Sequence, residues 1–130
     1  MKTRTVKQSV TLQARPHQVY ETLMDSRKHS RLTGAKAKID RKGGGKFTAF
    51  DGQINGYTLE VVPNKMIVQL WRAEHWPKGH YSTATFSLKK VKSGTRLTLL
   101  QTDVPAHDYK DICQGWREFY WKPMKEMPNK

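Results

Sequence analysis

The stretch YKDICQGWREFYWKPMKEM, Tyr109 to Met127, decides the fold of this 130-residue chain. Its apolar side chains recur at steps of three and four residues, which predicts one long amphipathic helix with a single apolar stripe. Within that helix, Gly115 should allow a close approach to a neighbouring element, and Pro123 should kink the helix or fray its last turn. The stripe consists of Tyr109, Ile112, Cys113, Trp116, Tyr120, Met124 and Met127.

Upstream of this helix, residues 34–104 predict six strands separated by short turns. Turn residues recur at 43–45 (Gly-Gly-Gly), 51–52 (Asp-Gly), 63–64 (Pro-Asn), 76–79 (Trp-Pro-Lys-Gly) and 93–94 (Ser-Gly). Because parallel strands need crossovers of a dozen or more residues, these short connections indicate an antiparallel meander.

The N-terminal part predicts a strand followed by two short helices. The strand alternates, so that one face carries Val6, Val10 and Leu12. Pro16 opens the first helix, over 16–25, and Ser26 is the expected N-cap of a second helix that Gly34 ends. We therefore expect one α+β domain over residues 1–130, in which a curved antiparallel sheet wraps around the long C-terminal helix.

Charge is the strongest feature of the composition. The chain has 24 Lys and Arg against 11 Asp and Glu, a net charge of +13. Eight of these cations lie between Arg27 and Lys46, where Asp40 is the only acid. Such a field attracts acidic protein surfaces, anionic lipid or nucleic acid, although a well-solvated face would have the same composition.

The single cysteine, Cys113, and the lack of an apolar leader segment fit a cytoplasmic protein. No apolar run approaches the length that a membrane span needs. Neither a cofactor nor a metal site is expected, because His75 and His80, which flank the Trp-Pro-Lys-Gly bend, have no further ligand cluster beside them. His80 is expected to be a hydrogen-bonded residue at the start of a strand, and Cys113 to be buried and structural.

No catalytic residues are nominated by the sequence, since no paired carboxylates or nucleophile–base pair stand out. The segment RKGGGK lacks the spacing of a phosphate-binding loop. The sequence does not favour nucleic-acid binding: aromatic and basic residues do gather around the bend, but the strand signature of RNA-recognition domains is missing.

Four ordered segments resemble the C-terminal domain of the activator of heat-shock protein 90 ATPase, a family within the START-like (SRPBCC) superfamily that includes the birch-pollen allergen fold. These are GKFTAFDGQINGYTLEVVPNKMIVQLWR (45–72), WRAEHWPKGHYSTATFSL (71–88), TRLTLLQTDVPAHDY (95–109) and GWREFYWKPMKEM (115–127). The shared motif positions include Trp71, Arg72, Trp76, Pro77, Gly79, His80, Val104, Pro105, Gly115, Trp116 and Tyr120.

The resemblance implies the helix-grip fold and a non-enzymatic co-chaperone that binds heat-shock protein 90. On this view the bend forms an exposed aromatic and basic edge, with partner contacts from Trp71, Arg72, Trp76, Lys78 and His80. The alternative that the superfamily implies is a binding protein for a small hydrophobic ligand held between sheet and helix. That cavity would be lined by Met66, Phe86, Leu97, Leu99, Trp116 and Tyr120.

Overall fold

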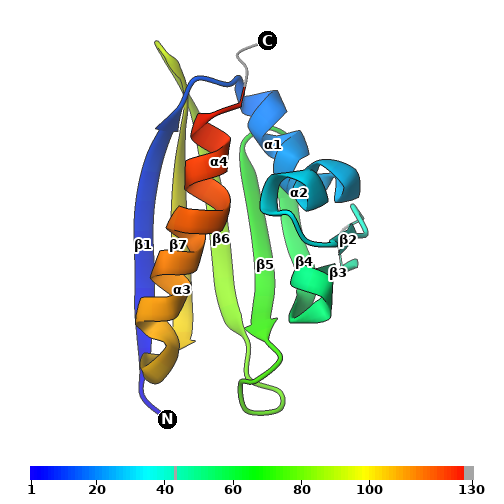
Figure 1. Ribbon diagram of the computed structural model, residues 1–130, viewed down its shortest axis with the longest axis vertical. Coiled ribbons are helices and arrows are strands. Elements are labelled where there is room, and N and C mark those ends of the chain that lie inside the picture. Colours follow the sequence, from blue (N-terminus) through cyan, green and yellow to red (C-terminus); the bar gives the residue numbers. More distant parts are fainter. Residues whose placement is uncertain (43, 128–130) are drawn as a thin grey trace.

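A seven-stranded antiparallel sheet forms the framework of the computed structural model, which describes residues 1–42 and 44–127 (Figure 1). The strands follow one another across the sheet in the order β1-β7-β6-β5-β4-β3-β2, so that the first strand pairs with the last. Their bounds are β1 Thr3–Leu12, β2 Lys38–Ile39, β3 Lys46–Ala49, β4 Ile54–Val62, β5 Met66–Ala73, β6 Ser82–Val91 and β7 Gly94–Pro105. This confirms the predicted meander, although β2 is only two residues long.

Two short helices connect β1 to the meander, α1 (Pro16–Met24) and α2 (Ser26–Thr33). Pro16 begins α1, and Gly34 ends α2 with a left-handed φ of 79°, both as predicted. The predicted N-cap is wrong, because the carboxylate of Asp25, not Ser26, accepts the hydrogen bond from the Lys28 amide at 2.9 Å. The Ser26 hydroxyl instead accepts the Ile39 amide and thereby holds β2 against α2.

The C-terminal helix is continuous but changes its pitch. It consists of α3 (Tyr109–Gly115), the π-helical segment η3 (Trp116–Trp121) and α4 (Lys122–Lys125), and ends two residues after Pro123. In a π-helix the backbone hydrogen bonds join residues five apart, instead of four apart as in an α-helix, so each turn is wider. Trp121 therefore joins Trp116 and Tyr120 in facing the sheet, and all three are buried.

The core lies between this helix and the concave face of the sheet, so the predicted packing is confirmed (Figure 1). Buried residues alternate with half-buried or exposed ones along β5, β6 and β7, as expected for strands with one covered face. The helix is pinned on both sides by hydrogen bonds from buried indoles. Trp116 donates to Gln101 of β7 at 2.8 Å, and Trp121 donates to Gln8 of β1 at 2.7 Å.

Some predictions about single positions need correction or lie out of reach. No atom lies within 4 Å of a Cβ built on Gly115, so this glycine does not serve a close helix–sheet approach. Of the predicted Gly-Gly-Gly turn, Gly43 lies outside the described residues. Across the described ranges, the longest and most apolar helices still fall short of what crossing a bilayer requires.

Candidate functional site: an apolar groove beside the C-terminal helix

The aromatic residues of the bend are buried, so the expected exposed edge is wrong for both tryptophans. Trp71 is 6% exposed and Trp76 is 3% exposed. Arg72 is occupied within the bend, because its guanidinium donates to the carbonyl of Trp76 at 2.8 Å and also to those of Pro77 and His80. The bend therefore owes its aromatic and basic composition largely to its own packing.

His80 and Lys78 complete the predicted partner-binding set. His80 precedes β6, and its Nε2 donates to the carbonyl of Asp103 at 2.8 Å, which confirms it as a hydrogen-bonded residue at a strand start. Lys78 is exposed. Of the five predicted residues, Lys78 is thus the one that keeps a free charged head at the surface of the bend.

The six residues predicted to line a ligand cavity do not enclose one. Phe86, Trp116 and Tyr120 border an internal void of about 20 Å³, which is close to the space of one water molecule. Leu97 and Leu99 are fully buried in the packed core. Met66 is misplaced by the prediction, since it alternates with the buried Ile67 on β5 and so lies on the opposite, convex face of the sheet.

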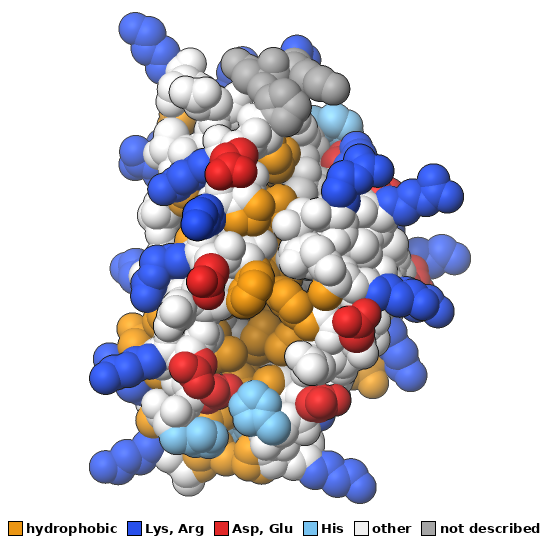
Figure 2. Space-filling model, viewed as in Figure 1, with side chains coloured by type: hydrophobic (Ala, Val, Ile, Leu, Met, Phe, Trp, Pro, Cys, Tyr) orange, Lys and Arg blue, Asp and Glu red, His pale blue; other side chains and the backbone are white. Residues whose placement is uncertain are grey.

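An open apolar groove lies on the surface between the C-terminal helix and the short helical turn η1 (Phe50–Gly52). Its volume is about 200 Å³. Figure 2 shows hydrophobic side chains gathered in the middle of this face, with Lys and Arg side chains around the outline. The residues that line it, which we call the apolar groove, are Phe50, Gln53, Ile54, Trp71, Asp111, Ile112, Gly115, Trp116, Phe119 and Tyr120.

Phe119 and Phe50 form the two aromatic walls of the groove. Phe119 is 44% exposed, although it lies in a helix whose neighbouring aromatic residues are buried. Its ring meets that of Phe50 edge to face, with centroids 5.6 Å apart. The Phe50 ring in turn lies 6.1 Å from that of Tyr120, so the exposed rings rest on the buried aromatic core.

The position of Phe50 depends on an unusual backbone. Phe50 and Asp51 have left-handed φ values of 51° and 56°, a conformation that bulky residues rarely adopt. Asp51 stabilises the turn through two bonds to Lys36: the Asp51 amide donates to the Lys36 carbonyl at 3.0 Å, and the Asp51 carboxylate accepts from the Lys36 amide at 3.2 Å. Strain of this kind is often retained where it places a functional side chain.

Beneath the groove, Tyr120 and His29 form a buried polar pair. The Tyr120 hydroxyl donates to Nε2 of His29 at 2.8 Å, and Nδ1 of His29 donates to the Leu23 carbonyl at 3.0 Å. Burial lowers the pKa of His29 and raises the pKa of Tyr120, so both are neutral at pH 7. With both nitrogens and the hydroxyl occupied, this pair fixes the helix against α2.

The remaining candidate residues are structural or isolated. Asp108 accepts the indole N–H of Trp76 at 2.7 Å and lies 2.9 Å from Nε2 of His75. Cys113 is buried, as predicted. Within residues 1–42 and 44–127, no cluster of three His, Cys, Asp or Glu could hold a metal ion. The ionisable side chains among the groove residues are Asp111 and Tyr120, so the groove offers apolar contact area and not a proton-transfer pair.

Sequence reasoning missed Phe50, Ile54 and Phe119 as surface contacts. Phe119 falls between two stripe positions, and that offset from the stripe was the one signal of its exposure. Phe50 looked like the end of a strand, because nothing in the pattern indicates a left-handed turn at a phenylalanine.

Comparison with known proteins gives one family over most of the chain. Residues 13–128 match the model of AHSA1, described as Activator of Hsp90 ATPase homolog 1-like protein. The human protein named Activator of 90 kDa heat shock protein ATPase homolog 1 is 31% identical over 111 residues, which is 85% of this chain and 33% of that protein. The chain thus spans about a third of the length of the curated relatives it matches.

Solved structures give the same fold. The crystal structure of an HSP90 activator from Plasmodium falciparum has a TM-score of 0.78 and 26% identity, covering 92% of this chain and 90% of that one. A protein from Mesorhizobium loti superimposes with a TM-score of 0.81 at 22% identity over 95% of each chain, a likeness of fold alone.

Proposed function

Because this chain belongs to the AHSA1 family of Activator of Hsp90 ATPase homolog 1-like proteins, we propose that it binds a chaperone of the 90-kDa heat-shock type and modulates its ATPase activity. In this role the protein is a co-chaperone that contributes a binding surface and no catalytic group of its own. We propose the apolar groove, with its exposed Phe119, as the binding site for the chaperone.

Groove geometry supports a protein partner. Aromatic anchors that enter a concave apolar site commonly dominate the energy of protein interfaces. Here the groove floor consists of closely packed side chains, because the rings of Trp71 and Trp116 are buried and their centroids lie 5.8 Å apart. An apolar side chain of the chaperone would contact Phe50 and Phe119 without any rearrangement of the fold.

Charge supports the encounter step. A net charge of +13 steers the protein toward an acidic surface, and such steering weakens as salt screens it. Lys78 on the bend is exposed, so its ammonium group can contact an acidic side chain of the partner. We therefore expect association that is faster and tighter at low salt.

The alternative is a small hydrophobic ligand, and it has less support. The internal void is too small for one, and the open groove, at about 200 Å³, is below the range of roughly 300–1,000 Å³ that is typical of ligand pockets. A shallow exposed site of this size fits a side chain of a protein partner better than an enclosed small molecule.

Gly115 offers a direct test, because it lies in the groove wall and has open space above it. Gly115→Leu should fill the groove without disturbing the fold, since the position is helical and replacing a helical glycine generally adds stability. Gln114→Leu is the matched control: it adds the same side chain at the adjacent exposed position, outside the groove lining. Binding would be measured by titration calorimetry against purified human Hsp90 at low salt, with and without a non-hydrolysable ATP analogue.

The wild type and Gln114→Leu should bind alike, whereas Gly115→Leu should bind about tenfold more weakly or worse, as for the loss of one interface anchor. The steady-state ATPase rate of the chaperone should change with the wild type and much less with Gly115→Leu. Absence of binding heat for the wild type under both nucleotide conditions would refute the chaperone proposal. Equal binding by all three proteins would leave the chaperone as partner but remove the groove as its contact.

A further inference from the structure

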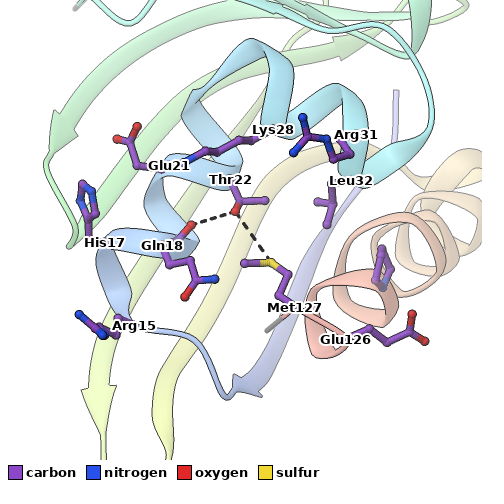
Figure 3. Close-up of a pocket in the computed structure, with 11 residues that line it drawn as sticks. Arg15, His17, Gln18, Glu21, Thr22, Lys28, Arg31, Leu32, Glu126 and Met127 are labelled. Carbon is purple, nitrogen blue, oxygen red and sulfur yellow. Dashed lines mark hydrogen bonds between the residues drawn. The ribbon is translucent and has the colours of Figure 1, made fainter. Parts of the chain in front are cut away.

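A second and larger concavity lies at the opposite end of the C-terminal helix from η2 (Ala106–Asp108), between α1, α2 and α4 (Figure 3). Its volume is about 640 Å³, within the range of small-molecule sites. The residues that line it, which we call the cationic cleft, are Arg15, His17, Gln18, Glu21, Thr22, Lys28, Arg31, Leu32, Pro123, Glu126 and Met127. None of them belongs to the apolar groove.

Positive charge is in excess at the rim of this cleft. Lys28 and Arg31 are three residues apart on α2 and both line the cleft from this helix, with the Lys28 side chain directed toward Glu21 of α1, and Arg15 lies at the start of α1 (Figure 3). All three are exposed, and the ion pairs found in the described part of the chain involve none of them. Their charged heads can therefore meet an anion without breaking an existing ion pair.

The acids on the rim do not cancel this charge. Glu21 is engaged mainly by Arg41, which donates to its carboxylate at 2.8 Å and holds the pKa of that carboxyl below its usual value, and Lys28 adds a weaker attraction to the same carboxylate. Glu126 is the other acid, and it belongs to the opposite wall, on the C-terminal side of the cleft (Figure 3). The α2 side is therefore the one that would hold an anionic group.

The floor of the cleft has a different chemistry. Leu32, Pro123 and Met127 supply apolar surface. Thr22 and Gln18 are polar residues beside them, and the Thr22 hydroxyl already donates to the Gln18 carbonyl at 2.8 Å and lies 3.8 Å from the Met127 sulfur. A ligand that fits this arrangement has an apolar body for the floor and an anionic head for Lys28 and Arg31.

We infer that the cationic cleft binds a small amphipathic carboxylate, whose head pairs with Lys28 and Arg31 and whose hydrocarbon part lies on Leu32 and Met127. Guanidinium and ammonium groups bind carboxylates through short charge-assisted hydrogen bonds. Neither the head nor the tail alone would satisfy the site, because bare cations prefer water and a short apolar floor buries little surface.

Octanoate is a suitable probe, with octan-1-ol as the uncharged analogue. Amide chemical shifts of the isotope-labelled protein would be followed by NMR during titration. Octanoate should produce saturable shifts around Thr22, Leu32 and Met127, and octan-1-ol should bind at least several-fold more weakly. The double variant Lys28→Gln/Arg31→Gln should weaken octanoate binding about tenfold or more, because hydrogen bonds to charged groups are lost.

The matched control is Lys89→Gln/Lys90→Gln, which removes the same charge from exposed positions on β6. This pair should bind octanoate like the wild type. The inference is overturned if both double variants lose affinity equally, since that would show only a non-specific effect of net charge. It is also overturned if the saturable shifts map to Phe50 and Phe119, if octan-1-ol binds as tightly as octanoate, or if millimolar octanoate gives no saturable shift.

Discussion

Replacing Gln101 with methionine should reduce the free energy of unfolding by about 2–4 kcal/mol, because Gln101 is the centre of the hydrogen-bonded chain that ties the C-terminal helix to the sheet. Its side-chain oxygen accepts the indole N–H of Trp116 at 2.8 Å. Its amide nitrogen donates to the Ser82 hydroxyl at 3.0 Å, and that hydroxyl donates to the Trp71 carbonyl at 2.7 Å. Gln101 and Ser82 are both 0% exposed, so water cannot replace a lost partner.

The magnitude follows from what each group loses. Methionine has nearly the length and volume of glutamine, so the packing term is small and the polar term dominates. The indole N–H of Trp116 would be left buried without an acceptor, at a cost of about 1–3 kcal/mol, and the loss of the bond to Ser82 adds about 1 kcal/mol. The sum of these two losses is the expected decrease in the free energy of unfolding, about 2–4 kcal/mol.

Urea unfolding followed by circular dichroism would measure this loss, with an unchanged slope against urea as evidence that the native state remains compact. Gln114→Met is the control, because Gln114 is exposed on the same helix and should change stability by less than about 0.5 kcal/mol. In a Trp116→Phe background the donor is already gone, so Gln101→Met should cost about 1–2 kcal/mol less than in the wild type. Stability within about 0.5 kcal/mol of the wild type for Gln101→Met, or a cycle with no coupling to Trp116, would refute the reasoning.

Three further outcomes are expected. Burial lowers the pKa of His29 from 6.5, so the unfolded chain binds a proton at this residue more readily than the folded chain does. The contribution of neutral His29 to stability is therefore complete above pH 6.5 and is lost as the pH falls through that value. In urea unfolding between about pH 7 and pH 5, the free energy of unfolding should decline less steeply for His29→Gln than for the wild type. Asp108→Ala should lower the free energy of unfolding by about 1–3 kcal/mol, because the buried indole N–H of Trp76 loses its acceptor; a melting temperature equal to that of the wild type would contradict this. Gly56→Ala should cost at least about 2 kcal/mol in thermal unfolding, since a Cβ there would lie 1.8 Å from the Leu70 carbonyl oxygen and would force β4 away from β5; a normal melting curve would count against so close an approach of the two strands.

The fold could be predicted from the sequence because its regular parts obey simple periods. Alternation placed Val6, Val10 and Leu12 on the buried face of β1, where they lie. The three- and four-residue steps placed Trp116 and Tyr120 on the buried face of the helix, where both are 5% exposed or less. The spacing of apolar residues along a strand or helix indicates which of its faces is buried, and so it predicts the residues of the core. The error at Trp71 and Trp76 has two causes: Trp71 falls on the buried face of β5, whereas Trp76 lies in the turn after β5, where no period indicates burial.

The apolar groove could not be predicted in the same way, because it arises where the chain departs from regular structure. In the π-helical segment η3, the longer turn brings Trp121 inward beside Trp116, with the two rings nearly parallel at 5.6 Å. Since the turn is filled by these buried rings, the intervening Phe119 is left 44% exposed at the edge of the helix. Across the groove, the left-handed turn at Phe50 directs a second ring toward it. The π-helical turn and the left-handed turn meet at one place on the surface, and this is why we propose the groove, and not the bend, as the binding site.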